Sequence, residues 1–427
     1  MSTKFEVGTW TGNNTSPQTI TLADSTLTPI AIIVWMTGAS AAPAAGSFAA
    51  NEIMSIGFGT RRGGSTQSGC VGIWSQDNVA TGSTGRVRNT TLLQVLAGEA
   101  VSDYTVSLSS FAAGQFTITY SSAANANGDF FHYAVFGGSD LTDANVINET
   151  MDGTTTQAIT GVGFQPDVLF AIDADLTTTG TETSNLALGF GCASSPTQQW
   201  TQCITATDGD TMANNMNWNH QINGSNCLAR LTINADTQSA LWDLNSFDSD
   251  GATLGVNDAP PATTSISTFL FIKGGSWEAG QLQKINLGDQ TFTLSNSNLV
   301  VRGIILGNVD ELVNQIGTGA TTFVLGAGST PNTTRGNAVN NCIGITGDEV
   351  ISTSADRFRA TDSVIEIMED PAATVTEAWY DTAGTGSFVI EWVTDSARNT
   401  LINYLAIGDS PAAGAETRQL ALQGVGQ

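Results

Sequence analysis

The chain has few basic side chains. Fourteen Lys and Arg stand against 39 Asp and Glu among 427 residues, which gives a formal net charge of −25. A protein that binds nucleic acid needs a basic face to displace counterions from the phosphates. The composition therefore argues against a nucleic-acid partner and predicts an acidic surface that keeps the chain soluble.

Long apolar runs and a leader segment are also missing. The longest apolar run, Pro29 to Met36, is far shorter than the roughly 20 residues that cross a bilayer. The first ten residues, MSTKFEVGTW, lack a basic segment followed by an apolar one. We expect no membrane partner and synthesis in a cytoplasm.

Histidine is scarce, and the familiar catalytic motifs are absent. The only histidines are His132 and His220, and the sequence contains no nucleophile elbow, phosphate-binding loop, zinc-protease helix or dinucleotide-binding turn. His132 falls inside an expected strand, which favours a structural role. His220 falls in an expected loop and is the better candidate for a general base. We expect no enzyme, no catalytic residue and no cofactor.

Acidic pairs occur, but their setting is that of turns. They are Asp208 with Asp210, Asp248 with Asp250, and Asp348 with Glu349. A glycosidase holds two carboxylates roughly 5 to 10 Å apart across a cleft, whereas acidic residues in surface turns usually stabilise the turn. The segment from Asp248 to Gly251 resembles the start of a calcium loop, yet an EF-hand needs an acidic ligand where Ala259 stands. We predict no metal site of that type, and calcium held by another loop arrangement stays open.

Five cysteines form no C-x-x-C pair and have no histidine at zinc-binding spacing: Cys70, Cys192, Cys203, Cys227 and Cys342. Buried free thiols are the expectation. A Cys192–Cys203 disulfide stays open, because the two residues could approach each other from adjacent strands.

What the chain does contain is glycine and small polar residues. It has 46 Gly, and only 12% of its residues are charged, a composition typical of short strands and turns rather than of surface helices. An all-β fold is therefore predicted.

An internal repeat organises these strands. A glutamine that opens an alternating strand recurs at Gln18, Gln157 and Gln290, and an aromatic closing strand recurs at Tyr133, Phe269 and Tyr404. Both signatures have a period of roughly 135 residues. A Gly-x-Gly strand end and a cysteine recur between them, as Gly57 to Gly59 with Cys70, Gly189 to Gly191 with Cys203, and Gly326 to Gly328 with Cys342. The three cysteines are expected to share one core position.

The repeat predicts three tandem antiparallel β-sandwich domains of jelly-roll or concanavalin-like type. Their expected bounds are 1–140, 141–276 and 277–410, with a C-terminal tail at 411–427. Two sheets packed face to face would bury the apolar alternation that each strand carries.

One stretch resembles a known module. The residues from Thr160 through GVGFQPDVLFAI, the later strand led by Asp250 and Gly251, and the aromatic strand at Phe269 resemble a module of tailed-bacteriophage virion proteins. In that module a GFQPD strand is followed by a DGF hairpin and an aromatic terminal strand. The other two repeats keep the pattern of strands but lack the GFQPD motif. The resemblance implies a β-sandwich virion component at the capsid surface or tail, with no active site to carry over.

These observations favour a non-enzymatic virion protein that assembles with other capsid or tail proteins, as an elongated spacer or lattice element and as a homo-oligomer, possibly a trimer. The alternative is an adhesin for host glycans, with Trp200, Trp218 and Trp242 as stacking candidates. Tryptophans of this kind are more often core residues. The basic pair Arg61 and Arg62 is expected in a solvated or subunit-contacting loop.

Overall fold

The computed structural model describes residues 2–38, 49–76, 82–209, 218–233, 235, 237–260, 264–284, 287–309, 311–318, 321–329, 339–347, 356–361, 363–369, 373–394 and 400–409. All regular structure within these ranges is β-strand. The prediction of an all-β fold built from antiparallel sandwiches is confirmed. Over the same ranges no helix is long and apolar enough to cross a membrane.

The strands follow the sequence repeats. We call residues 1–140 the first repeat, 141–276 the second and 277–410 the third. The first repeat contains β1 (Thr3–Thr11), β2 (Gln18–Thr21), β3 (Pro29–Met36), β4 (Ala49–Ala50), β5 (Glu52–Arg62), β6 (Ser65–Ser75), β7 (Thr84–Asn89), β8 (Leu93–Gly98), β9 (Val101–Ala112), β10 (Gln115–Tyr120) and β11 (Phe130–Gly138).

The second repeat contains β12 (Leu141–Met151), β13 (Thr156–Ile159), β14 (Val168–Asp173), β15 (Thr183–Ser184), β16 (Leu186–Ser195), β17 (Gln198–Ala206), β18 (Asn219–Asn223), β19 (Leu228–Leu231), β20 (Gln238–Asp248), β21 (Gly251–Asp258) and β22 (Ser265–Gly274). The third contains β23 (Ser276–Gln283), β24 (Gly288–Thr293), β25 (Val300–Asn308), β26 (Gln315–Thr318), β27 (Thr321–Ser329), β28 (Val339–Gly347), β29 (Asp356–Ala360), β30 (Ile365–Glu369), β31 (Ala373–Ala383), β32 (Ser387–Thr394) and β33 (Leu401–Asp409).

One strand order recurs three times. Each repeat forms a four-stranded sheet, for example β2-β10-β9-β8, and a larger sheet, for example β1-β11-β3-β5-β6-β7. Each larger sheet is completed by a seventh strand that comes from another repeat: β15 joins the first sheet, β26 the second and β4 the third. The second repeat thus completes the first, the third completes the second, and the first completes the third. This cyclic strand exchange closes the chain into a body with approximate three-fold arrangement.

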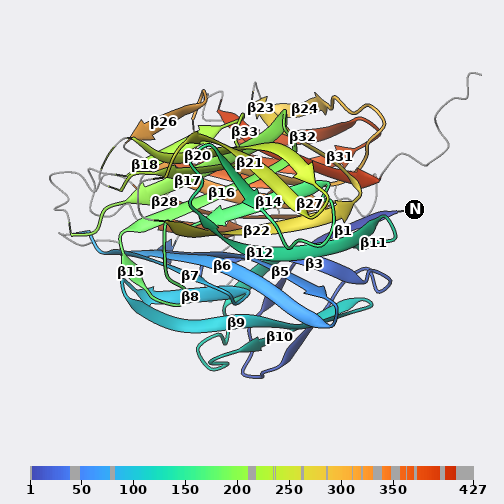
Figure 1. The fold of residues 1–427 in the computed structure, drawn as a ribbon. Helices are drawn as coiled ribbons and strands as arrows, with labels where there is room; N and C mark the ends of the chain where they lie inside the picture. Colours follow the sequence, from blue (N-terminus) through green and yellow to red (C-terminus); the bar gives the residue numbers. More distant parts are fainter. Residues whose placement is uncertain are drawn as a thin grey trace, which may run out of the picture.

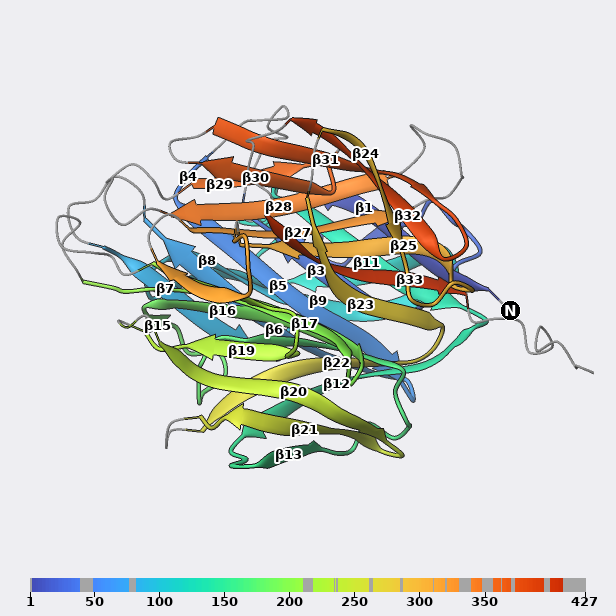
Figure 2. The same ribbon diagram turned by 90° about the horizontal axis from the view of Figure 1, so that it is seen from above.

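The larger sheets lie inside this body and the four-stranded sheets lie outside. In Figures 1 and 2 the strands β9 and β10, β20 and β21, and β31 and β32 occupy three outer sides. The larger sheets bury both of their faces. Ile33, Phe170 and Ile305 contribute to one central core shared by all three repeats, whereas their neighbours in sequence face the separate cores of the sandwiches: Ile32, Leu169 and Ile304. Burial on both faces explains why these strands read as continuous apolar runs.

The repeated glutamine ties the second strand to the rest of its sheet. Gln18 accepts a hydrogen bond from the hydroxyl of Tyr120 at 2.7 Å, and Gln290 accepts one from Nε1 of Trp392 at 2.8 Å. Gln157, in the second repeat, accepts instead from the backbone of the preceding turn. The recurring glutamine is therefore a structural element of the fold.

The three cysteines of the sequence signature do not share one position. In each repeat the closing aromatic residue pairs with a residue on the neighbouring strand, and that residue pairs in turn with a glycine on the strand after it. The glycines found in this way are equivalent, and they are Gly57, Gly191 and Gly326. Across the next strand they face Cys70, Thr201 and Cys342. Cys203 lies two residues further along β17, so the predicted equivalence is wrong for the second repeat.

The arrangement also differs from an elongated stack of domains. The three larger sheets surround a common core, and the exchanged strands cross the expected boundaries at residues 140 and 276. The division into separate domains stays a prediction, and so does a trimer of chains. The approximate three-fold relation seen here lies within a single chain.

Candidate functional site

Both histidines are buried in contacts between repeats. His132 is 0% exposed, stacks beside Trp35 and faces the central core from β11. Burial and then the charge of Arg359 lower its pKa to about 3, while Asn341 acts in the opposite direction. His220 lies on strand β18 rather than in the expected loop, and its Nε2 is 2.6 Å from Oε1 of Glu311 in the third repeat. Neither ring is presented to a solvent-filled cleft in which it could act as a general base.

The three tryptophans proposed for glycan stacking are core residues. Trp200, Trp218 and Trp242 are 0%, 1% and 0% exposed. Trp200 donates from Nε1 to the backbone oxygen of Tyr404 at 2.7 Å and so joins the second repeat to the third. A sugar ring cannot stack on a side chain that is covered on both faces. Of the two interpretations considered for these tryptophans, the structure therefore supports that of core residues.

The described members of the acidic pairs accept hydrogen bonds within the fold. Asp248 accepts hydrogen bonds from the hydroxyls of Ser246 and Thr253. Asp208 accepts from the backbone nitrogen of Thr84, across the contact with the first repeat. The partner acids Asp210, Asp348 and Glu349 lie outside the described residues. Within the described part of the chain, no group of three or more His, Cys, Asp or Glu side chains is placed to hold a metal ion.

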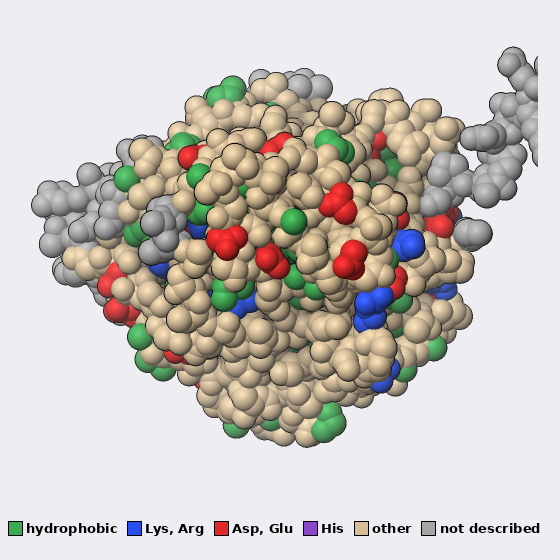
Figure 3. Space-filling model, viewed as in Figure 1, with side chains coloured by type: hydrophobic (Ala, Val, Ile, Leu, Met, Phe, Trp, Pro, Cys, Tyr) green, Lys and Arg blue, Asp and Glu red, His purple; other side chains and the backbone are tan. Residues whose placement is uncertain are grey.

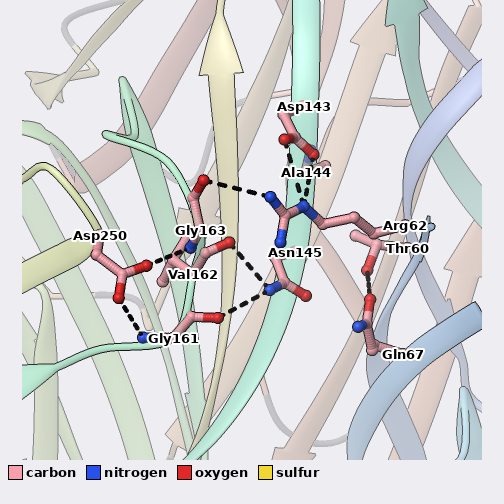
Figure 4. Close-up of polar contacts among 10 residues, drawn as sticks. All are labelled: Thr60, Arg62, Gln67, Asp143, Ala144, Asn145, Gly161, Val162, Gly163 and Asp250. Atoms are coloured by element: carbon pink, nitrogen blue, oxygen red, sulfur yellow. Dashed lines mark hydrogen bonds and ion pairs between the residues drawn. The ribbon is translucent and has the colours of Figure 1, made fainter.

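The GFQPD segment is held by Asp250, the residue considered above as part of a calcium loop. Figure 4 shows the carboxylate of Asp250 accepting from the backbone nitrogens of Gly161 at 3.1 Å and Gly163 at 2.5 Å. Both glycines have positive φ, +79° and +85°, a conformation that glycine adopts without strain. Asn145 completes the loop by donating to the oxygens of Gly161 and Val162. The carboxylate of Asp250 is thus already engaged as an acceptor for backbone N–H groups.

Each remaining part of the motif has a structural partner as well. Phe164 is 5% exposed and packs in the core of the second sandwich. Gln165 donates to the oxygen of Phe247, and Asp167 accepts from the nitrogen of Gly274 at 2.6 Å. The residues behind the resemblance therefore fix the second and closing strands of the sandwich and form no binding site of their own.

Arg62 joins the first repeat to this module. Its guanidinium donates to Asp143 at 3.1 Å and to the backbone oxygen of Gly163 at 3.2 Å, and it lies 5.6 Å from the ring centre of Phe164 (Figure 4). The expected solvated or subunit-contacting role is thus corrected for Arg62, which makes an intrachain contact between repeats. Arg61 is exposed.

Two buried glutamates hold equivalent turns in the first and third repeats. Glu6 and Glu278, 8% and 2% exposed, each accept two backbone N–H bonds of 2.8 Å and one bond from a tyrosine hydroxyl, that of Tyr133 or Tyr404. The second repeat has Asn145 at this position, and Asn145 donates to backbone oxygens instead. These acids therefore position backbone and are not free for catalysis.

The second repeat also buries an ion pair that the others lack. Asp173 and Arg230, 2% and 3% exposed, form two hydrogen bonds of 2.9 and 2.8 Å. The guanidinium carbon of Arg230 lies 5.1 Å from the ring centre of Trp242. The register places Met36 and Val95 at the equivalent positions of the first repeat. Sequence reasoning missed this pair, because its members are 57 residues apart and lie in no motif.

All five cysteines are free and buried, as expected. Cys192 lies opposite Trp200 and Cys203 lies opposite Gly189, so the two thiols are not paired across β16 and β17. Burial raises the pKa of the Cys70 thiol to about 12, partly offset by a hydrogen bond with Thr91. Such thiols are poor nucleophiles and poor metal ligands.

The surface carries charge of mainly one sign. Figure 3 shows acidic side chains spread over one face, with Lys and Arg visible on both its left and its right. A groove of about 490 Å³ lies beside β1, where Lys4, Glu6, Asp24 and Arg302 line it together with Phe5. Its charged groups are engaged with one another or with neighbours, as in the 2.7 Å ion pair of Lys4 with Asp24. The groove contains no paired carboxylates set apart for hydrolysis.

Comparison with known proteins gives no family. No family model matches the chain, and no curated protein matches it. Two solved structures of PNGF-II, in space groups C2 and P21, align over 90% and 89% of this chain and 98% and 99% of their own, at 8% identity and a TM-score of 0.19. A TM-score this low does not indicate a shared fold, so nothing about PNGF-II is carried over.

Proposed function

We propose that this chain is a non-enzymatic structural protein of a tailed-phage virion, which acts by assembling with other virion proteins. The observation that carries the proposal is the cyclic strand exchange, which closes three sandwiches around one core. Polar and aromatic side chains, among them Arg62, His220 and Trp200, make contacts between the repeats. Such a body suits a rigid building block.

The approximate three-fold arrangement favours a place at the capsid surface. Symmetric particles present three equivalent or nearly equivalent neighbours around each three-fold position. A chain with three similar outer sheets can contact three such neighbours at once. The exposed sides of β9, β20 and β31 and of their sheets are the surfaces we expect to make these contacts (Figure 2).

The glycan-binding alternative has lost its candidate residues. Trp200, Trp218 and Trp242 are buried. Among the exposed large apolar residues of the described chain there is one tryptophan, Trp379, and it is 37% exposed. Nothing in the described part of the chain favours this alternative over assembly.

The test is the composition and symmetry of purified particles. We expect density-purified particles from the source to contain the chain in a fixed ratio to the main shell protein, and cryo-electron microscopy to place it over three-fold or local three-fold positions. Presence in a few copies at the tail would overturn the capsid-surface assignment. Absence from the particles would overturn the virion assignment itself.

A further inference from the structure

A basic residue recurs at each of the three interfaces between repeats. Arg86, His220 and Arg357 occupy equivalent positions, because each lies directly opposite the exchanged strand that completes its sheet. Two positions further along the same strands, on the same face, stand Arg88, Ile222 and Arg359. The fold therefore places cations where it joins consecutive repeats.

The first two interfaces supply acceptors to these cations, although Nε of Arg86 and of Arg88 has no hydrogen-bond partner among the described residues. Arg86 donates to the backbone oxygens of Ser184 and Asn185 at 3.0 and 3.2 Å, and the charges of Asp175 and Asp173 act on it. Arg88 donates to the side-chain oxygens of Thr179 and Asn148 at 2.5 Å each.

The second interface uses the pair of His220 with Glu311 in the same way. At both interfaces the acceptors come from the repeat that supplies the exchanged strand.

The third interface supplies fewer acceptors. Arg359 is 2% exposed, and its Nε, Nη1 and Nη2 have no hydrogen-bond partner among the residues that the structure describes. Nε and Nη1 of Arg357 also lack partners. The guanidinium carbon of Arg359 lies 3.5 Å from the ring centre of Phe130, which holds the group in place without accepting its N–H bonds. The two arginines thus present five donor nitrogen atoms without acceptors to one interface.

The reason lies in the segment that the first repeat contributes. The connection that carries β15 includes Asp175 and Glu182, and the one that carries β26 includes Glu311, whereas residues 37–51, which carry β4, contain neither Asp nor Glu. Asp129 acts on Arg357 by its charge, but it accepts its hydrogen bond from Tyr104. Within the described part of the chain, the two arginines therefore lack the hydrogen-bond acceptors that Arg86 and Arg88 find in the second repeat.

Two neutral polar side chains, Asn341 and His132, lie close to Arg359. Nδ2 of Asn341 has no partner, and neither ring nitrogen of His132 makes a hydrogen bond of normal geometry. Asn341 is on the same face as Arg359, because Ile343, two residues away on β28, pairs with Arg359. The charge of Arg359 acts on His132. Unused donors and a buried positive charge are what an anion requires.

We propose that the interface between the third and first repeats binds a small oxyanion, such as inorganic phosphate or sulfate, between Arg359 and Arg357. The planar fork of a guanidinium matches two oxygens of such an anion, and the bond is strengthened by charge. Asn341 would donate a further hydrogen bond from β28. A polynucleotide is excluded, because Arg359 is 2% exposed within a strongly acidic protein.

The test is calorimetric titration of inorganic phosphate into the full chain, purified without phosphate or sulfate and held at constant ionic strength. We expect saturable binding to wild type. We expect Arg359→Met, which removes the donors but keeps an apolar stem over Phe130, to bind at least about tenfold more weakly, because charge-assisted hydrogen bonds of this kind correspond to roughly ten- to a hundredfold in affinity. Arg357→Met should weaken binding in the same direction.

Arg88→Met is the matched control, since Arg88 is the equivalent of Arg359 but already has acceptors. It should bind phosphate as wild type does, even if its melting temperature falls. Phosphorus NMR line broadening by wild-type protein tests binding without any substitution. The proposal is overturned if wild type shows no saturable binding, or if Arg359→Met and Arg88→Met bind phosphate equally well.

Discussion

The buried pair of Asp173 and Arg230 can be tested by a double-mutant cycle that uses the residues of the first repeat as replacements. At the equivalent positions of the first repeat stand Met36 and Val95. We therefore consider Asp173→Met, Arg230→Val and the two together. Arg230→Val leaves the buried Asp173 without its hydrogen-bonded guanidinium, and Asp173→Met leaves Arg230 with only its 3.4 Å ion pair to Asp175. The double change replaces the hydrogen-bonded pair itself by the apolar residues of the first repeat.

The magnitudes follow from the geometry. At 2.8 Å and an effective dielectric constant of about 20, the attraction between the charges is about 6 kcal/mol. Removing both ions from water costs several kcal/mol each, so the pair contributes little net stability. Each single variant is expected to lose about 3 to 5 kcal/mol, and the double variant to lie within about 2 kcal/mol of wild type. The coupling energy is then about 4 kcal/mol or more.

The pair also predicts a dependence on pH. Burial alone would raise the pKa of Asp173, but the charge and hydrogen bonds of Arg230 outweigh it and hold the pKa below its ordinary value of 3.8. A carboxyl of this kind stabilises the fold above its unfolded pKa and loses that contribution as the pH falls through the lower folded value. The double variant should therefore be less sensitive to acid than wild type below about pH 4.

The assay is urea unfolding followed by tryptophan fluorescence and by far-ultraviolet circular dichroism, whose transitions must coincide before free energies of unfolding are compared. Losses of the two single variants that add up in the double variant, to within about 0.5 kcal/mol, would refute the reasoning, because independent sites are additive.

Three further results are expected. His132 is neutral in the fold with a pKa of about 3 against an ordinary 6.5, so its contribution destabilises the fold progressively below pH 6.5, by about 2 to 3 kcal/mol near pH 4.5. In the third repeat the residue equivalent to His132 is Asn403. The variant His132→Asn should therefore fold and should lose that part of the acid sensitivity; an unchanged pH profile of the free energy of unfolding would contradict this. Glu278→Gln should cost about 1.5 to 3 kcal/mol in urea unfolding, because its carboxylate accepts two backbone bonds of 2.8 Å, and a neutral outcome would remove its role as a clamp. The native chain should show no rapidly labelled thiol with a thiol-specific reagent and all five after denaturation, because every cysteine is free and buried; rapid labelling before unfolding would count against the packing.

Local patterns were sufficient for the class of fold. The alternation of apolar and polar residues, the turn residues and the spacing of Gln18, Gln157 and Gln290 depend on neighbours along the chain, so they could be read without coordinates. The apolar runs from Pro29 to Met36 and from Val168 to Ile172 were expected as strands, but their burial on both faces was found only in the structure. The free state of the cysteines was also expected from their spacing.

Register was harder to infer, and the second repeat shows why. Aligning Gly189 with Gly57, instead of Gly191, shifts the strand by two residues. Such a shift keeps every side chain on the same face, since the period of a strand is two. Apolar patterning cannot detect it, and the misplaced equivalence of Cys203 followed. Only the hydrogen-bonded partners across the sheet decide between the two registers.

The sequence alone was enough for the repeats and the β class, because those depend on spacing along the chain and on alternation within a strand. Tertiary structure alone decided that three repeats close into a ring, that Trp200 is core and that Arg359 lacks the acceptors given to Arg88. These outcomes depend on which distant segments meet. A strand that leaves its own repeat to complete another carries no local mark of its destination, since any unpaired sheet edge offers the same backbone donors and acceptors.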